Sequence, residues 1–238
     1  MPRSPIKRPP VSLDLSKVLR DVDDLPEVLS SQTLFGNDAP LEIEVGSGKG
    51  LFLATASAAN PAFNFVGIEI MAKYAAHAAG RLLRAHNDQD AAVANAMMIS
   101  GNAEPLFQNR IEPGSLEAVH VYFPDPWWKK RHRKRRVVNE KSIRNFSRAL
   151  RVGGRLHFWT DVLDYFESTI ELIAELAPEF GVPIPEEEVQ ATHDLDYRTH
   201  FERRSRQHQI PVYRVRYEKK SDAANESHAS QTQSVQDI

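Results

Sequence analysis

The sequence predicts an α/β fold with a mostly parallel central sheet and helices on both faces. Short apolar segments typical of buried strands alternate along the chain with longer segments of helical character. Strands that alternate with helices form βαβ units, in which the strands are parallel. The chain has 238 residues, of which 41% are hydrophobic and 26% are charged, and this suits one large domain. Ligands of such sheets bind at the carboxyl ends of the strands, so we seek a site there.

The expected elements have clear boundaries. The first strand runs into a glycine-rich turn, and Asn60-Pro61 ends the alanine-rich helix that follows this turn. A later helix ends at the turn Gly153-Gly154. Strands are expected at residues 41–45, 63–70, 97–100, 118–123, 155–160 and 209–217, and helices at residues 51–59, 71–86, 140–150 and 163–176.

The two ends of the chain differ in composition from its middle. Residues 1–40 contain six prolines and show no sustained period, so we expect a flexible arm with one helical turn near residues 16–20. Residues 221–238 are rich in Ser, Gln, Ala and Asn, which predicts a disordered tail. The folded domain is therefore expected over residues 41–220.

Composition excludes several classes of protein. No segment approaches the ~18 uncharged apolar residues of a membrane-spanning helix, and no apolar run follows the first residues as in a secretory signal. The chain has no cysteine, which excludes disulfides, thiolate metal sites and a catalytic thiol. The histidine spacings match no metal-ligand pattern. We expect a cytoplasmic protein that binds neither a membrane nor a metal.

Charge is distributed unevenly along the chain. Residues 1–128 carry 10 Lys and Arg against 15 Asp and Glu, whereas residues 129–220 carry 20 against 14. A basic C-terminal half favours an anionic partner such as a nucleic acid.

The first strand ends in a turn with the spacing Gly-x-Gly-x-Gly, of which Gly46 and Gly48 are candidate cofactor contacts. Such a turn is either a plain strand-to-helix connection or a nucleoside site. Glu69 ends the next strand, where a carboxylate can accept the hydroxyls of a ribose, although it can also be a solvated strand-end charge. Leu51 stands where a dinucleotide fingerprint needs glycine, and the acidic Glu44 suits the cationic amino-acid end of S-adenosylmethionine better than a pyrophosphate. Charge therefore favours S-adenosylmethionine over NAD.

Two further candidates follow later strands. Asn102 can hydrogen-bond an adenine edge, or it can serve ordinary turn chemistry. In the motif Phe-Pro-Asp-Pro-Trp at residues 123–127, two prolines restrict the backbone around Asp125, although they can equally be simple loop stiffeners. The following eight residues, 129–136, are seven Lys or Arg and one His, and in this context we expect them to contact RNA phosphates. The expected phosphate contacts are Lys130, Arg131, Arg133, Lys134, Arg135 and Arg136.

Together these segments resemble the bacterial tRNA (guanine-N7-)-methyltransferases, a branch of the Rossmann-like class I methyltransferases. The resemblance covers about residues 41–217, and its most specific part is the motif at 123–127 followed by Lys-Lys-Arg-His at 129–132. The other matching segments are residues 43–50, 67–69, 160–161 and 199–202.

The resemblance implies transfer of the methyl group of S-adenosylmethionine to N7 of a guanosine in tRNA, usually guanosine 46 of the variable loop. It implies that Asp125 is the active-site residue. The implied cofactor contacts are Glu44, Glu69, Asn102 and Asp125. The implied guanosine contacts are Lys129, Asp161, Thr199, His200, Phe201 and Glu202.

The sequence departs from the family pattern at three positions. Many relatives have Asp where Asn102 stands, a smaller or more polar residue at Trp128, and Lys at His200. Two alternatives stay open: a catalytically silent RNA-binding module on the same fold, and an NAD-dependent dehydrogenase. The acids at 44, 69, 125 and 161 argue against the first alternative, and Leu51 with Glu44 argues against the second.

Overall fold

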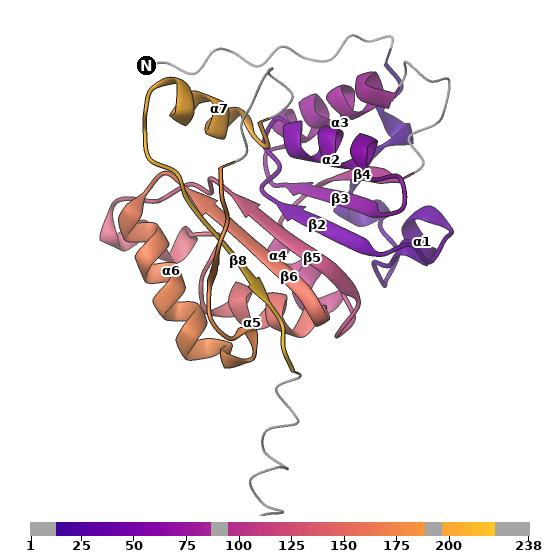
Figure 1. The fold of residues 1–238 in the computed structure, drawn as a ribbon. Helices are drawn as coiled ribbons and strands as arrows, with labels where there is room; N and C mark the ends of the chain where they lie inside the picture. The colour runs from indigo at the N-terminus through magenta and orange to yellow at the C-terminus, as the bar shows by residue number, and fades with distance from the viewer. Residues whose placement is uncertain (1–12, 87–94, 189–196, 222–238) are drawn as a thin grey trace, which may run out of the picture.

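The computed structural model describes residues 13–86, 95–188 and 197–221 and shows the expected fold, a twisted sheet between two layers of helices (Figure 1). The sheet order is β1-β4-β3-β2-β5-β6-β8-β7. Strands β1 to β6 pair in parallel, and β8 pairs antiparallel with β6 and β7. The strands are β1 (Leu19–Asp21), β2 (Leu41–Val45), β3 (Asn64–Glu69), β4 (Ala96–Ser100), β5 (Leu116–Tyr122), β6 (Leu150–Thr160), β7 (Ile184–Pro185) and β8 (Tyr213–Glu218).

The helices separate onto the two faces of the sheet. Helices α2 (Leu51–Ala59) and α3 (Ala72–His86) cover one face, where Phe65 and Met98 pack against Leu82. Helices α4 (Ala103–Asn109), α5 (Glu140–Ala149) and α6 (Leu163–Leu176) lie on the other (Figure 1). Helix α7 (His200–Gln207) lies on the same side as α2 and α3, near the carboxyl ends of the central strands (Figure 1).

Residues 13–40 correct the prediction of a flexible arm. They form the short helices η1 (Leu15–Lys17), η2 (Val22–Asp24) and α1 (Ser31–Phe35), and β1 pairs with β4 at the edge of the sheet. Val18, Leu25 and Leu29 are buried, and Arg110 donates to the carbonyls of Val22 and Leu25 at 3.1 and 3.2 Å. The folded unit therefore begins well before residue 41. Residues 1–12 and most of the expected tail (222–238) lie outside the described residues.

Other differences are local. The strand expected at 209–217 is β8, and the turn Gly153-Gly154 lies inside β6, where the register with β5 shifts. The sequence did not predict α4 or α7. In the part of the chain that the structure describes, no helix has the length and apolar character needed to cross a membrane.

Candidate functional site

The turn between β2 and α2 keeps its glycines in a left-handed backbone conformation. Gly46, Gly48 and Gly50 have φ values of 81°, 53° and 67°, which favour glycine. The N–H of Gly46 donates to the carbonyl of Ile68 on β3 at 2.8 Å. A Cβ on Gly50 would lie 2.6 Å from the Cβ of Ala78, so this glycine also lets α2 approach α3. The turn thus presents main-chain atoms at the carboxyl ends of β2 and β3.

Glu44, on β2 beside this turn, is a buried carboxylate that lacks a partner on one oxygen. Its exposed fraction is 3%, and Oε2 has no hydrogen-bond partner among the described residues. Burial raises the pKa of Glu44 to about 8, with the Ser47 hydroxyl opposing this change and the Glu69 charge adding to it. A buried charge is costly unless a cation or a donor meets it. Glu44 therefore fits the cationic amino group of S-adenosylmethionine.

Glu69 joins the glycine turn to the start of α3. Its carboxylate accepts from the N–H of Gly48 at 2.8 Å and from the N–H of Met71 at 2.9 Å. These two bonds fix the carboxylate at the end of β3, and a carboxylate has about four lone-pair positions, so acceptor capacity remains for ribose hydroxyls. Asn102 caps α4, because its Oδ1 accepts from the N–H of Glu104 at 3.1 Å. The NH₂ group of Asn102 takes no part in that cap.

The loop that carries Asp125 has an unusual backbone on both sides of it. Phe123 and Trp127 have φ values of 49° and 46°, a conformation that costs a bulky residue about 1–3 kcal/mol and is concentrated at functional sites. The N–H of Phe123 donates to the carbonyl of Trp159 at 2.7 Å, and its ring stacks on that of Phe201 at 6.1 Å. The surrounding contacts thus hold the loop in place while the side chain of Asp125 remains exposed.

The basic segment 129–136 has two different parts. Arg136 is buried: its Nε donates to the carbonyl of Pro126 at 2.9 Å, Nη2 reaches Asp164 at 3.1 Å, and the guanidinium lies over the Tyr165 ring. This residue anchors the Asp125 loop to α6 and is not placed to meet RNA. Arg131, Arg133, Lys134 and Arg135 are exposed, whereas the side chain of Lys130 is outside the described part of the chain. The expected phosphate contacts are therefore best placed on the exposed members.

The expected guanosine contacts also differ in accessibility. Lys129 and Asp161 are exposed beyond the ends of β5 and β6, and Phe201 is 43% exposed. Thr199 caps α7 by accepting from the N–H of Glu202 at 3.0 Å. Glu202 is only 1% exposed and accepts from the N–H of Arg198 at 2.7 Å, from Arg206 at 2.6 Å and from Arg214 at 3.4 Å. These contacts indicate that Glu202 holds α7 in place.

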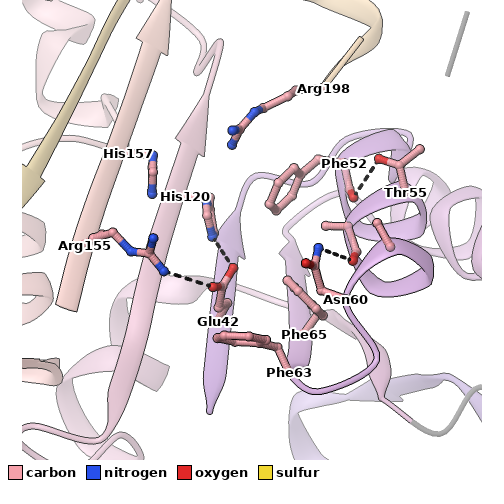
Figure 2. A pocket seen from close by; sticks show the side chains of 12 residues that line it. Glu42, Phe52, Thr55, Asn60, Phe63, Phe65, His120, Arg155, His157 and Arg198 are labelled. Carbon is pink, nitrogen blue, oxygen red and sulfur yellow. Dashed lines mark hydrogen bonds and ion pairs between the residues drawn. The ribbon is translucent and has the colours of Figure 1, made fainter. Parts of the chain in front are cut away.

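A cleft of about 540 Å³ lies between α2 and the neighbouring strands of the sheet (Figure 2). Phe52, Phe63 and Phe65 form its apolar side, and polar side chains of β2, β5 and β6 form the other. The ring of His157 stacks on that of His120 at 4.8 Å, and His157 Nδ1 lies 3.0 Å from Glu186. The indole of Trp159 donates to Glu186 at 2.6 Å. The cleft therefore adjoins a polar network within the protein.

A chain of hydrogen bonds runs from this cleft to α7. Nη1 of Arg198 donates to the Tyr122 hydroxyl at 2.7 Å, and Tyr122 lies 2.9 Å from Nδ1 of His120. Nε2 of His120 lies 2.9 Å from Glu42 (Figure 2). Because Arg198 only donates, the Tyr122 hydroxyl gives its proton to His120, which in turn donates from Nε2 to Glu42. Burial lowers the pKa of His120 well below its ordinary value, which agrees with the neutral ring that this order requires.

Sequence reasoning missed the residues of this chain. His120 gave a signal, because it interrupts the otherwise apolar segment 118–123. Arg198 gave none, because it comes from a distant segment that only the fold brings to Tyr122. Among the described residues, no three His, Asp or Glu side chains are grouped as metal ligands.

Comparison with known proteins identifies relatives over most of the chain. A family model described as a putative methyltransferase matches residues 38–215. The chain is 63% identical over 226 residues to a tRNA (guanine-N(7)-)-methyltransferase of Rhodopirellula baltica, covering 93% of this chain and 81% of that protein. It is 34% identical to a protein of the same name from Xanthomonas campestris, covering 91% and 77%. A tRNA (m1A58) methyltransferase from Aquifex aeolicus shares the fold, with a TM-score of 0.51 at 16% identity over 76% of this chain and 63% of that one.

Proposed function

The chain belongs to the tRNA (guanine-N(7)-)-methyltransferase family, and from this premise we propose how its residues carry out the reaction. It is an enzyme that transfers the methyl group of S-adenosylmethionine to N7 of a guanosine in tRNA. This family membership contradicts the dehydrogenase alternative. The finer statements below concern the roles of single residues, the position of the guanosine and the location of the enzyme.

The observation that carries the proposed donor site is the buried, half-paired carboxylate of Glu44. It meets the amino group of the methionine end, while the main chain at Gly46 and Gly48 allows the donor to approach closely. Glu69 accepts from the ribose hydroxyls, and the NH₂ group of Asn102 donates to the adenine edge. When bound, S-adenosylmethionine supplies a methyl group on a positively charged sulfur, which keeps the bonding electron pair when the methyl group leaves.

The residues of the chain do not need to remove a proton. Guanine N7 carries a lone pair and no hydrogen, so it attacks the methyl carbon directly and becomes positively charged. Catalysis then comes from holding N7 in line at about 3 Å from the carbon, and from a fixed carboxylate near the developing charge. We assign this task to Asp125, which the strained loop holds rigidly, with Asp161 beside the end of the neighbouring strand. Lys129 and Phe201 are placed to hold the nucleotide.

By its resemblance to the family, we infer that the target is guanosine 46 of the variable loop and that the enzyme works in the cytoplasm, where tRNA is found. The test is nucleoside mass spectrometry of a tRNA transcript incubated with the protein and labelled S-adenosylmethionine. We expect labelled 7-methylguanosine, and none in a transcript in which guanosine 46 is replaced by adenosine. Label in the altered transcript would overturn the position, and no label in either would support a silent RNA-binding module.

A further inference from the structure

A second group of cationic side chains lies near the site, apart from residues 129–136. Its members act on one another electrostatically and come from the glycine turn, α3 and α7. We call this group the α3–α7 basic cluster, and it consists of Lys49, His77, Arg81, Arg84, His200 and Arg203.

The centre of the α3–α7 basic cluster is a contact between two groups that are both cationic when protonated. Nε of Arg81 donates to the carbonyl of Lys49 at 3.0 Å, and Nη2 lies 2.8 Å from Nε2 of His200. Arginine has no acceptor, so Nε2 of His200 must accept and the ring is neutral. In the described part of the chain, no carboxylate lies within ion-pair distance of Lys49, Arg81 or Arg84. Positive charge is therefore gathered here without an acidic counterpart for these three residues.

The cluster and the basic segment 129–136 flank the reaction site. In the sheet order β3-β2-β5-β6, the glycine turn follows β2 and the Asp125 loop follows β5. Helix α3 follows β3 on one side, whereas segment 129–136 is tied through Asp164 to α6 on the other side. Phe201, next to His200, exposes 43% of its surface and stacks on the ring that precedes the Asp125 loop. Cations beside an exposed aromatic ring are typical of surfaces that bind unpaired nucleotides.

We propose that the α3–α7 basic cluster binds a phosphate group of the tRNA backbone, so that the RNA is held on both sides of the reacting guanosine. This inference rests on the proposed function, because it takes tRNA as the partner. A phosphate has oxygens that accept from several cations at once, and it supplies the negative charge that Lys49, Arg81 and Arg84 lack among the described residues.

We expect phosphate binding by the α3–α7 basic cluster to be coupled to protonation of His200. Burial and the charges of Arg81, Arg203, Lys49 and His77 lower the pKa of His200 to about 4. A phosphate facing these groups adds negative charge and raises the pKa of His200, so the complex binds more protons than the free protein. The affinity for tRNA should therefore increase as the pH falls from about 7 towards 5.

The first test measures how the affinity for tRNA depends on salt. Arg84→Gln and Arg203→Gln each remove one charge of the cluster without touching the Arg81–His200 contact. We expect each change to weaken tRNA binding several-fold and to reduce the slope of log K against log salt by about one. The matched control is Arg144→Gln, an exposed arginine of α5 on the opposite face, which should leave the slope unchanged. Unchanged slopes for both cluster variants would overturn the proposal, as would a loss of S-adenosylhomocysteine affinity without a change in slope.

The second test counts protons by titration calorimetry of tRNA binding in buffers of different ionisation enthalpy near pH 5.5. The wild-type protein should take up a fraction of a proton that His200→Asn does not, whereas the exposed His208→Asn should behave as the wild type. Equal uptake by wild type and His200→Asn would overturn the coupling. The same preparations are assayed for 7-methylguanosine. If the wild type forms 7-methylguanosine but the cluster variants bind tRNA as tightly as the wild type, only the phosphate-binding proposal is wrong. If the wild type forms no 7-methylguanosine, the proposed function is wrong.

Discussion

We expect Glu44 to be protonated in the free protein and ionised in the donor complex. Its pKa of about 8 exceeds the ordinary value of 4.5, mainly because of burial. Between these two values the folded protein holds a proton that the unfolded chain has released. The folded state binds more protons in this window, so the free energy of unfolding falls as the pH rises through it, by up to about 1.4 kcal/mol per pH unit.

Glu44→Gln tests this residue because it removes the titration and keeps the shape of the side chain. The melting temperature of the variant minus that of the wild type should increase as the pH rises from about 5 to 8. Its affinity for S-adenosylhomocysteine should fall about 10-fold or more, because the amino group of the ligand loses its counter-charge. Thermal unfolding across pH and calorimetry measure the two effects. Glu104→Gln, a partly exposed glutamate, is the control, and parallel melting curves for variant and wild type would contradict the pKa assignment.

Asp125 is expected to act on the reaction more than on the fold, since its side chain is exposed. Asp125→Ala should lower kcat about 100-fold, because a misplaced base loses the in-line geometry and the developing charge loses its nearby carboxylate. Single-turnover methylation at saturating tRNA and donor measures this change. The exposed Asp38→Ala serves as the control for loss of an acid. Near-normal turnover in Asp125→Ala would remove this residue from the mechanism.

At the scale of elements, α7 is held by side chains on the sheet and has no apolar face of its own. The buried residues of α7 are Glu202 and Ser205, and Arg198 joins its start to Tyr122 on β5. Tyr122→Phe removes the hydroxyl that links Arg198 to His120 and leaves both without that partner. An unmade hydrogen bond of this kind costs about 1–3 kcal/mol. We therefore expect lower stability in urea and faster amide exchange in residues 200–207, together with a higher KM for tRNA.

A conservative change separates the hydrogen-bond chain from simple packing. In His120→Gln the amide oxygen can accept from Tyr122 while the NH₂ group donates to Glu42, whereas His120→Leu can do neither. His120→Gln should keep amide exchange in α7 close to that of the wild type, and His120→Leu should match Tyr122→Phe. Equal exchange in both His120 variants would mean that packing alone positions α7.

Elements with a regular apolar pattern could be predicted, and those without one could not. The bounds of β2, α2 and α6 agree with the sequence because apolar periodicity and turn residues both mark them. Helix α4 has seven residues with a proline inside, and α7 buries polar groups that pair with arginines of other elements. The local sequence of either helix does not differ from that of a loop. These two helices could therefore be identified only from the structure.

The topology of the whole sheet explains why the acids of the candidate site were easier to predict than the residues that hold the surrounding helices in place. Glu44, Glu69, Asp125 and Asp161 all lie in or just beyond strands β2, β3, β5 and β6, and parallel strands bring their carboxyl ends to one edge of the sheet. Strand assignment therefore suffices to group them. The partners of Glu202 and the Arg81–His200 contact join segments far apart in the chain, and their pairing depends on packing that no local pattern records.

The N-terminal segment shows the same limit, because its prolines suggested a flexible arm while three of its apolar residues, Val18, Leu25 and Leu29, are buried in the domain. Leu29 is 1% exposed and its N–H donates to the carbonyl of Arg110 at 2.7 Å; Val18 is also 1% exposed.

Leu29→Ala should lower the free energy of unfolding of the whole domain by about 2–5 kcal/mol, and Val18→Ala by a smaller amount. Val182→Ala, at a residue 80% exposed, is the control. Urea unfolding followed by tryptophan fluorescence reports on this stability, because all three tryptophans lie in the later part of the chain, at 127, 128 and 159. If Leu29→Ala left the fluorescence midpoint unchanged, residues 13–40 would be an appendage and not a part of the cooperative unit.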